Sequence, residues 1–344
     1  MINENLKVAM IYYGSSPHPS HEGFAEAIGA DILSCNSGHE SSKYGSIIGE
    51  LKKGIYLDYD VIISEGSRPL ITSSLQSVFN DSKLIYLCAD QFFYNLSFDS
   101  SKTIFHKLEK KAQSSIFNYN IDGIIAVSEF AAEFMRCIVG SSVPIQVVHP
   151  FIQWERFDDL NNATPNLESQ TAITISSAPS GTVGQYKGVD LLVKAWKKVR
   201  QEYPNATLLV VGKGHPESYE DTEGVVVEGY VDSISDVIQE ASVYVQPSRA
   251  DTYPVAVLEA LRAGLPTVVT RTTGNRSEIR TIDPNLVADP SVESLAETVK
   301  NYFQMSIDEK SNISAISAQR GERYRPDVWK PAFRRSFYSM ISDI

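Results

Sequence analysis

Short apolar runs rich in β-branched residues alternate with helical stretches along this chain, and that alternation most constrains its fold. The runs contain few polar residues, as expected of strands buried on both faces of a parallel sheet. Stretches such as Thr103–Asn118 and Glu129–Ile138 are suited to crossover helices. The alternation therefore predicts an α/β fold built on a parallel sheet. In the first part of the chain the predicted strands are Val8–Tyr12, Asp31–Cys35, Val61–Ser64, Leu84–Cys88, Ile124–Val127 and Ile145–Val148.

The alternation stops once and then begins again. Residues Asp158 to Gln170 are rich in Asn, Asp, Thr, Ser and Pro, which is typical of a linker. We therefore expect two α/β domains with a cleft between them, and ligands at the carboxyl ends of the strands. A terminal helix is predicted over Asp327–Met340, packing on one of the domains. The second set of predicted elements comprises the strands Ala172–Ser176, Thr207–Val211, Val225–Val227, Val243–Val245 and Thr267–Thr270, and the helices Val189–Glu202, Ser235–Ala241, Val255–Ala263 and Val292–Gln304.

Charge and cysteine content narrow the function classes. The chain has 344 residues and a net charge of −11. A site for nucleic-acid phosphates leaves a basic footprint, so this acidity argues against a nucleic-acid partner. The cysteines, Cys35, Cys88 and Cys137, are odd in number and widely spaced, which favours reduced thiols over a disulfide framework or a zinc site. Because the N-terminus is polar and no apolar run approaches about 18 residues, we expect a cytoplasmic protein.

The most informative loop follows the predicted strand Val243–Val245 and leads into a helix. Asp251 stands just before that helix, and Glu259 stands inside it among apolar residues. Pro254 lies between them, at the expected first helical position. The unpaired N–H groups of a first helical turn attract anions. An anion site flanked by two carboxylates is what a nucleotide-sugar pocket requires.

Both carboxylates also have structural interpretations. Asp251 could cap the helix, as aspartate before a helix commonly does. Glu259 is costly to bury alone, so it needs either ribose hydroxyls or a partner arginine such as Arg262 or Arg276. Spacing alone leaves the two interpretations open.

Other loops are predicted at the same ends of the sheets. Lys187 opens a helix after a small-residue loop, where a lysine suits a diphosphate but could also be merely solvated. Gly14 follows the first strand and allows either a close ligand or an ordinary turn. Gly274 lies in the turn after the strand Thr267–Thr270, which could be a plain loop. His18 alone indicates a surface histidine. These glycines match neither a dinucleotide fingerprint nor a Walker A loop.

Taken together, these loops resemble the retaining GT-B glycosyltransferases of glycosyltransferase family 4. The likeness covers nearly the whole chain and is strongest from Ile173 to Val299. It is carried by Lys187–Leu192, Leu209–Gly214, Val227–Val231, Ala241–Ser248, and Asp251–Glu259 in place of the family's Glu-x7-Glu pair, with Ile125–Glu129 and Pro150–Phe157 similar to landmarks of the N-terminal half.

The resemblance implies a GT-B fold of two Rossmann-like domains facing a cleft. Residues 1–157 would form the acceptor-side domain, and residues 158–324 would bind the nucleotide-sugar donor. A C-terminal helix within about 325–344 would pack back on the N-terminal domain.

The resemblance also implies roles for individual residues. Lys187 would contact the donor diphosphate, Asp251 the transferred sugar and Glu259 the ribose. The candidate catalytic residues are Asp251, Lys187, Asp90 and His18. The candidate donor-binding residues are Gly14, Lys187, Gly212, Tyr253, Val255, Ala256, Glu259 and Gly274.

Three positions depart from the family pattern. Asp251 replaces a glutamate and is shorter by one methylene. The family's arginine before the lysine is missing, since Gly181 and Thr182 stand there. The histidine of a His-Asp pair is replaced by Ala89, so Asp90 or His18 would have to stand in.

The implied activity is transfer of a sugar from a nucleoside diphosphate donor to a hydroxyl of a glycan, glycolipid or lipid-linked saccharide. Configuration would be retained, and neither a metal nor a cofactor would take part. The departures leave two alternatives open. One is a non-catalytic GT-B protein that binds a nucleotide or glycan, or supports a partner enzyme. The other is a GT-B epimerase acting on a nucleotide sugar.

The segment Gln91–Asn120 mixes aromatic residues with lysines. It could make a weak peripheral contact with the inner face of a membrane that carries a lipid-linked acceptor. The favoured interpretation is a core helix with a solvated lysine face.

Overall fold

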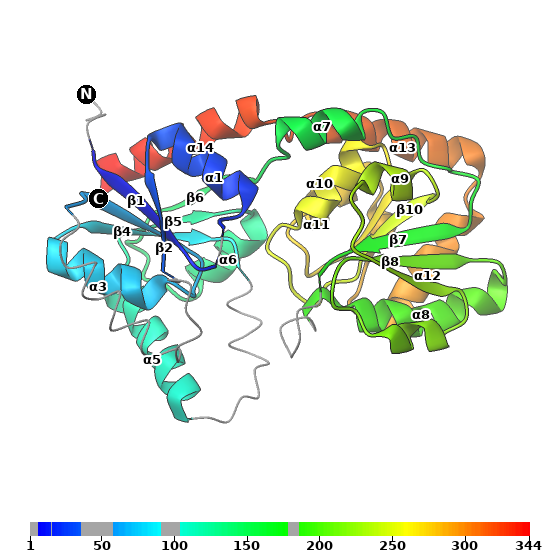
Figure 1. The fold of residues 1–344 in the computed structure, drawn as a ribbon, viewed down its shortest axis with the longest axis horizontal. Coiled ribbons are helices and arrows are strands. Elements are labelled where there is room, and N and C mark those ends of the chain that lie inside the picture. Colours follow the sequence, from blue (N-terminus) through cyan, green and yellow to red (C-terminus); the bar gives the residue numbers. More distant parts are fainter. Residues whose placement is uncertain (1–5, 15, 36–57, 91–103, 178–185) are drawn as a thin grey trace. The chain divides into compact units, whose positions relative to one another are not determined.

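The computed structural model describes residues 6–14, 16–35, 58–90, 104–177 and 186–344 (Figure 1). The chain divides into two compact units. Unit 1 comprises Met1–Pro150 together with Pro326–Ile344, and unit 2 comprises Phe151–Arg325. The division thus falls before helix α7 (Trp154–Leu160), whereas the sequence places it between residues 157 and 158.

Unit 1 contains one parallel six-stranded sheet in the order β2-β1-β3-β4-β5-β6. The strand order changes direction between β1 and β3, which are neighbours in the sheet. Crevices at such switch points, outside the carboxyl ends of the strands, bind the ligands of open α/β sheets. The strands are β1 (Val8–Tyr12), β2 (Asp31–Ser34), β3 (Val61–Glu65), β4 (Lys83–Cys88), β5 (Gly123–Ala126) and β6 (Ile145–Val147).

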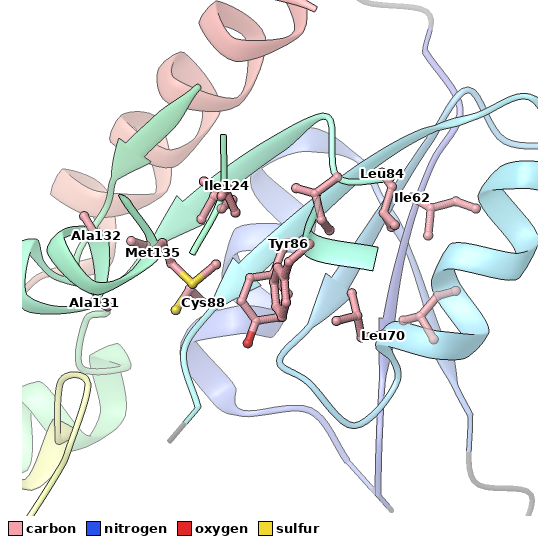
Figure 2. Close-up of a cluster of buried hydrophobic side chains, with 14 of the residues drawn as sticks. Ile62, Leu70, Leu84, Tyr86, Cys88, Ile124, Ala131, Ala132 and Met135 are labelled. Carbon is pink, nitrogen blue, oxygen red and sulfur yellow. The ribbon is translucent and has the colours of Figure 1, made fainter. Parts of the chain in front are cut away.

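The two faces of this sheet are covered by different helices. The helices are α1 (Pro19–Ile28), α3 (Leu70–Asn80), α5 (Ile104–Tyr119), α6 (Glu129–Arg136) and α14 (Pro326–Asp343). On one face, alternate strand residues such as Ile62, Tyr86 and Ile124 pack with Leu70 of α3 and Met135 of α6 (Figure 2). On the other face, α1 and α14 lie side by side (Figure 1). Burial on both faces explains why the strands are almost wholly apolar.

Helix α14 belongs to unit 1 although it is far from the rest of the unit in sequence. The ring of Phe333 stacks on that of Phe24 of α1, with 4.4 Å between their centroids. Met340 approaches Gly123 of β5 so closely that a Cβ at that glycine would lie 2.3 Å from the sulfur. The helix is therefore held by packing against both a helix and the sheet.

Unit 2 contains a second parallel six-stranded sheet, in the order β12-β11-β10-β7-β8-β9. Its first strand, β7, lies between β10 and β8, so its switch point falls between β7 and β10. This is the Rossmann strand order. The strands are β7 (Thr171–Ile175), β8 (Thr207–Val211), β9 (Val225–Gly229), β10 (Val243–Gln246), β11 (Thr267–Thr270) and β12 (Val287–Ala288).

Helices cover both faces of this sheet as well. Helices α8 and α12 pack on each other, as do α10 and α13 (Figure 1). The Tyr302 hydroxyl of α12 donates to the backbone oxygen of Ser242 at 2.6 Å, which ties α12 to the start of β10. Besides α7, the helices are α8 (Val189–Glu202), α9 (Ile234–Ile238), α10 (Val255–Arg262), α11 (Arg276–Ile282), α12 (Val292–Gln304) and α13 (Ile307–Gly321), with short 3-10 helices at Glu217–Asp221 and Pro284–Leu286.

The two parallel sheets confirm the predicted α/β fold, and most predicted strands begin and end within a residue or two of the observed ones. The structure adds α1, α3, α7, α11, α13 and β12, which the sequence analysis does not predict. Helix α7 also occupies the first residues of the expected linker.

Replacing Phe333 with Ala should destabilise unit 1 strongly, because Phe333 is fully buried and stacked on Phe24. We expect a loss of about 3–5 kcal/mol in the free energy of unfolding. The matched control is Phe79→Ala in the same unit, where the ring is 60% exposed and the loss should stay below about 1 kcal/mol. Urea unfolding of both variants measures this, and equal losses would contradict the packing of α14.

Candidate functional site

The candidate site of unit 2 lies at the switch point of its sheet. The loop after β7 leads to Lys187 and Gly188 at the start of α8, and the loop after β10 runs from Pro247 to Pro254. These two strands are direct neighbours, so their loops emerge side by side. The fold thus brings together two of the segments that the sequence analysis selects.

Backbone contacts join the two loops. The Arg249 amide donates to the Tyr186 carbonyl at 2.7 Å. Gly188 has a φ of +69°, and a Cβ there would lie 2.0 Å from the carbonyl oxygen of Pro247. Only glycine allows this approach. The bidentate ion pair of Arg249 with Asp190, at 2.6 and 2.7 Å, fastens the same two segments through side chains.

Lys187 and Asp251 form an ion pair at the centre of these loops. The Nζ of Lys187 lies 2.7 Å from Oδ2 of Asp251, and the two side chains are 19% and 3% exposed. Burial by itself lowers the pKa of Lys187, but the Asp251 carboxylate and Tyr186 more than offset this and leave that pKa raised. Lys187 is therefore cationic at neutral pH and directly bound to a carboxylate.

A chain of buried polar side chains runs from β10 to Asp251. The Tyr244 hydroxyl donates to the Gln246 side chain, and the Gln246 amide donates to Ser248 Oγ at 2.7 Å. Ser248 Oγ then lies 3.5 Å from Oδ2 of Asp251. The sequence analysis does not predict this row of hydrogen-bonded side chains. Its signal is the alternation of Tyr, Gln and Ser with apolar residues and Pro along Val243–Ser248, which puts polar side chains on one face of a buried strand.

The backbone of Asp251 is fixed by the loop after β11. The Asp251 amide donates to the Thr272 carbonyl at 3.1 Å, and the Gly274 amide donates to the Asp251 carbonyl at 2.8 Å. Asp251 and Thr273 also form an isolated parallel bridge. Gly274, a predicted donor-binding residue, thus lies beside Asp251 and holds its backbone.

Helix α10 begins at Val255, with Pro254 as its N-cap residue. Pro254 is therefore not the first helical residue, and Asp251 does not cap the helix. The capping interpretation of Asp251 is wrong because the carboxylate turns to Lys187 instead. Pro254 carries no side-chain acceptor, so the first turn, with Val255 and Ala256, presents its N–H groups without a side-chain cap from that position.

Glu259 lies in α10, just beyond its first turn, and its side chain is 14% exposed. Its ionic partner is Arg156 of α7, at 3.6 Å, rather than Arg262 or Arg276. Burial raises the pKa of Glu259 to about 7, and Arg156 offsets only part of that effect. Burial also raises the pKa of Tyr244 well above its usual value, and the carboxylates of both Asp251 and Glu259 add to that increase. Both acids therefore act on the same buried tyrosine.

The two arginines considered for Glu259 have other partners. Arg262 binds Glu322 at 2.5 Å and also donates to the Phe157 carbonyl, and Arg276 donates to the Arg271 carbonyl. The side chain of Tyr253, a predicted donor-binding residue, is buried, and its hydroxyl lies 2.8 Å from that of Tyr324.

Gly212 holds the end of β8 against the loop after β7. It has a φ of +125°, and a Cβ there would lie 1.8 Å from the carbonyl oxygen of Ser176. His215 then bonds the same carbonyl through Nε2 at 2.7 Å. Gly212 thus fixes the position of the Ser176 backbone, directly after β7.

In unit 1, the predicted residues Gly14 and His18 follow β1 at that unit's own switch point. Gly14 has a φ of +133°, which favours glycine. His18 is the N-cap of α1, and its Nδ1 accepts from the Ser20 amide at 3.2 Å. Sequence reasoning missed the neighbouring pair of His21 Nδ1 with Glu65, which lies at the end of β3 and is largely buried.

Asp90 is engaged on both of its oxygen atoms. Oδ2 accepts from the amide and the hydroxyl of Ser67, at 2.7 and 2.5 Å, and Oδ1 accepts from the Tyr86 hydroxyl at 2.8 Å. These bonds fix the loop after β3, where Gly66 approaches Asp90 closely. Asp90 thus serves at least to shape that loop.

Several expectations fall outside the described residues. These include Gly181 and Thr182, and most of the aromatic and lysine-rich stretch from Gln91 onward. Among the described residues, no helix has the length and hydrophobicity needed to span a membrane. Within the same ranges, no set of three or more His, Cys, Asp or Glu side chains is arranged as a metal site.

Two parallel six-stranded sheets, each in a Rossmann-like unit with helices on both faces, define a GT-B fold. Within unit 2, residues 178–304 match the family model described as "Glycosyl transferases group 1". The chain therefore resembles this family in the region that holds Lys187, Asp251 and Glu259.

Comparison with curated proteins gives a partial match. The chain is 29% identical over 165 residues to a Haemophilus influenzae protein named "Uncharacterized glycosyltransferase". The aligned region covers 45% of this chain and 39% of that relative, so the match spans well under half of its length.

Solved structures match over nearly the whole chain. Anabaena Alr3699/HepE in complex with UDP-glucose has a TM-score of 0.74 at 13% identity, covering 97% of this chain and 100% of that one. Sucrose-phosphate synthase from Thermosynechococcus elongatus has a TM-score of 0.73 at 12% identity, covering 99% and 100%. WaaG, a glycosyltransferase involved in lipopolysaccharide biosynthesis, has a TM-score of 0.69 at 14% identity, covering 97% and 99%. At these identities the likeness establishes the fold.

Replacing Gly212 with Ala should displace the backbone at the end of β7, because the added Cβ would collide with the Ser176 backbone. We expect a loss of more than about 3 kcal/mol in the free energy of unfolding. The matched control is Gly229→Ala, where φ is also positive but no atom lies within 4 Å of the added Cβ. The control should lose only about 1–2 kcal/mol. Denaturant unfolding compares the two, and similar losses would show that the Ser176 backbone yields to the methyl group.

Glu259 should make stability fall as pH rises. Its pKa is about 7 in the folded protein, against an ordinary value of 4.5, so the folded state holds a proton that the unfolded state releases. The free energy of unfolding should therefore decrease between these two pH values. Glu259→Gln removes this decrease and should be the more stable protein at pH 8, by at most about 3 kcal/mol. Unfolding measured from pH 4.5 to 8 tests it. If the free energies of unfolding of the two proteins ran parallel over this pH range, the prediction would be wrong. The control is Glu293→Gln, which changes a carboxylate on the surface.

Proposed function

We propose that this protein is a glycosyltransferase that uses a nucleoside diphosphate sugar as donor, with the donor site on unit 2. The single observation that carries the proposal is the buried Lys187–Asp251 pair, set between two joined loops at a sheet switch point. A lysine and the start of α10 suit a diphosphate, and the carboxylates of Asp251 and Glu259 suit hydroxyl groups.

Each residue has a role in this proposal. Lys187 and the first turn of α10, with Val255 and Ala256, bind the diphosphate. Asp251 orients the sugar, and Glu259 accepts hydrogen bonds from the ribose hydroxyls. As the bond to the sugar breaks, negative charge grows on the leaving diphosphate. Fixed N–H groups and a lysine stabilise that charge more in the transition state than in the ground state.

The comparisons with known proteins support a glycosyltransferase that uses a nucleotide sugar. The matched region of the family model contains all the residues given a donor role above. The Anabaena relative is described in complex with UDP-glucose, and a neighbour of similar fold is a sucrose-phosphate synthase. We propose further that transfer retains configuration, needs no metal and takes place in the cytoplasm, on a glycan, glycolipid or lipid-linked acceptor bound by unit 1.

A second candidate is a GT-B protein that binds a nucleotide sugar without transferring it. One observation favours it, namely that both oxygen atoms of Asp90 are committed to Ser67 and Tyr86. Turnover by the purified protein would exclude this candidate.

Replacing Lys187 with Ala should abolish donor use while leaving the protein folded, because the diphosphate loses its fixed cation. Donors are first screened by thermal shift with UDP-, GDP- and ADP-sugars, since a ligand that binds the folded state raises the melting temperature. Release of nucleoside diphosphate from the best donor is then measured with and without acceptors. We expect a fall of at least about a hundredfold.

The matched control is Lys198→Ala, which removes an exposed lysine from the same unit, 3.6 Å from Glu293. It should keep full activity. The assignment would fail if folded Lys187→Ala and Glu259→Ala proteins released the diphosphate as fast as the unmodified protein.

A further inference from the structure

We propose that Asp251 acts as an internal counter-ion of Lys187 that a diphosphate must displace, so that the site holds a diphosphate firmly only when a sugar comes with it. The inference rests on the proposed function, and it assigns Asp251 a role in discriminating a donor from a nucleotide without sugar.

Lys187, the cation of the site, already has an anionic partner. Lys187 Nζ is 2.7 Å from Asp251, whose side chain is only 3% exposed. The nearby Arg249 is bound by both oxygens of Asp190. A diphosphate that approaches Lys187 therefore meets an ammonium group that already has an anionic partner.

The two anions compete for Lys187. A phosphate within bonding distance of Nζ would lie close to the Asp251 carboxylate, in a place where burial weakens solvent screening. Two like charges at such separations repel strongly in a low-dielectric environment. Diphosphate binding must therefore separate Asp251 from Lys187.

Once it is separated from Lys187, the Asp251 carboxylate has few other hydrogen-bond donors within reach. Its backbone is held by Thr272 and Gly274, so only its side chain can rotate. Its other polar neighbour is the Ser248 hydroxyl, which accepts from the Gln246 amide and donates to Oδ2 of Asp251 over a long 3.5 Å, a weak replacement for the ammonium group. A buried carboxylate without a good donor is costly.

A sugar supplies the missing donors. Hydroxyl groups of a hexose on the diphosphate can donate to the released carboxylate and restore its hydrogen bonds. A nucleoside diphosphate without the sugar leaves Asp251 buried and poorly bonded. The counter-ion therefore penalises the product of transfer more than the donor, and this favours product release.

The central comparison is between a nucleotide sugar and a methyl ester, which differ in the sugar but not in the charge of the diphosphate. The probes are the nucleotide sugar selected by the thermal-shift screen, the matching nucleoside diphosphate, and the methyl ester of that diphosphate on its terminal phosphate. Calorimetric titration measures their Kd values for the unmodified protein and for Asp251→Asn. The asparagine keeps the size of the side chain and removes its charge.

For the unmodified protein, we expect the methyl ester to bind at least about tenfold more weakly than the nucleotide sugar. In Asp251→Asn, the methyl ester and the free diphosphate should each gain about tenfold in affinity, while the nucleotide sugar gains little. The preference for the sugar should therefore nearly disappear, and turnover should fall because the sugar is no longer oriented.

Glu293→Gln is the matched control, because it removes one carboxylate charge from the surface of the same unit, where Glu293 is 73% exposed. It should leave all three Kd values unchanged. The inference is overturned if Asp251→Asn binds the methyl ester no better than the unmodified protein does.

Equal affinity of the unmodified protein for ester and sugar nucleotide would also overturn it, even if the variant failed to fold. If the unmodified protein binds neither nucleotide sugars nor nucleoside diphosphates, the proposed function itself fails. That outcome is distinct from the other two.

Discussion

The close approach of two backbone segments, Tyr186–Gly188 and Pro247–Arg249, is the constraint on which the site in unit 2 depends. The contact needs a glycine at 188, because any side chain there would collide with the Pro247 carbonyl. It is possible at all because β7 and β10 are neighbours although they are far apart in sequence. The contact between the loops places Lys187 next to Asp251, with which it forms an ion pair. The ion pair of Arg249 with Asp190 joins the same two segments.

The buried polar groups of unit 2 make this site more rigid than its loops alone would be. Tyr244, Gln246 and Ser248 form a continuous line of hydrogen bonds beneath Asp251. Such networks are worth most when every member is satisfied, because the low dielectric that strengthens each bond also makes an unpaired group costly. Unit 1 contains a comparable arrangement around Asp90, where Ser67 and Tyr86 together hold the loop after β3. In both units, polar side chains at the strand ends fix the loops that carry the candidate residues.

The sequence predicts the fold well because parallel strands must be apolar on both faces, and that pattern is local. It predicts Lys187, Asp251 and Gly274 as site residues, and the structure brings them together. It does not predict the partner of Glu259, because Arg156 lies on a different helix about a hundred positions earlier. It gives Asp251 the alternative role of a helix cap, which fails because Pro254 occupies the capping position and the Asp251 carboxylate binds Lys187 instead. Helices such as α1 and α7 escape prediction because each lacks a clear apolar period.

The start of α10 has a consequence for how this protein persists in a cell. With proline in the capping position, the helix lacks a stabilising contribution that a serine or aspartate would supply, on the order of 1 kcal/mol. An anion bound at that turn would supply it instead. Under the proposed function, ligand binding at this turn would therefore make unit 2 more stable than the empty unit. The resistance of the chain to proteolysis would then rise with the supply of that ligand.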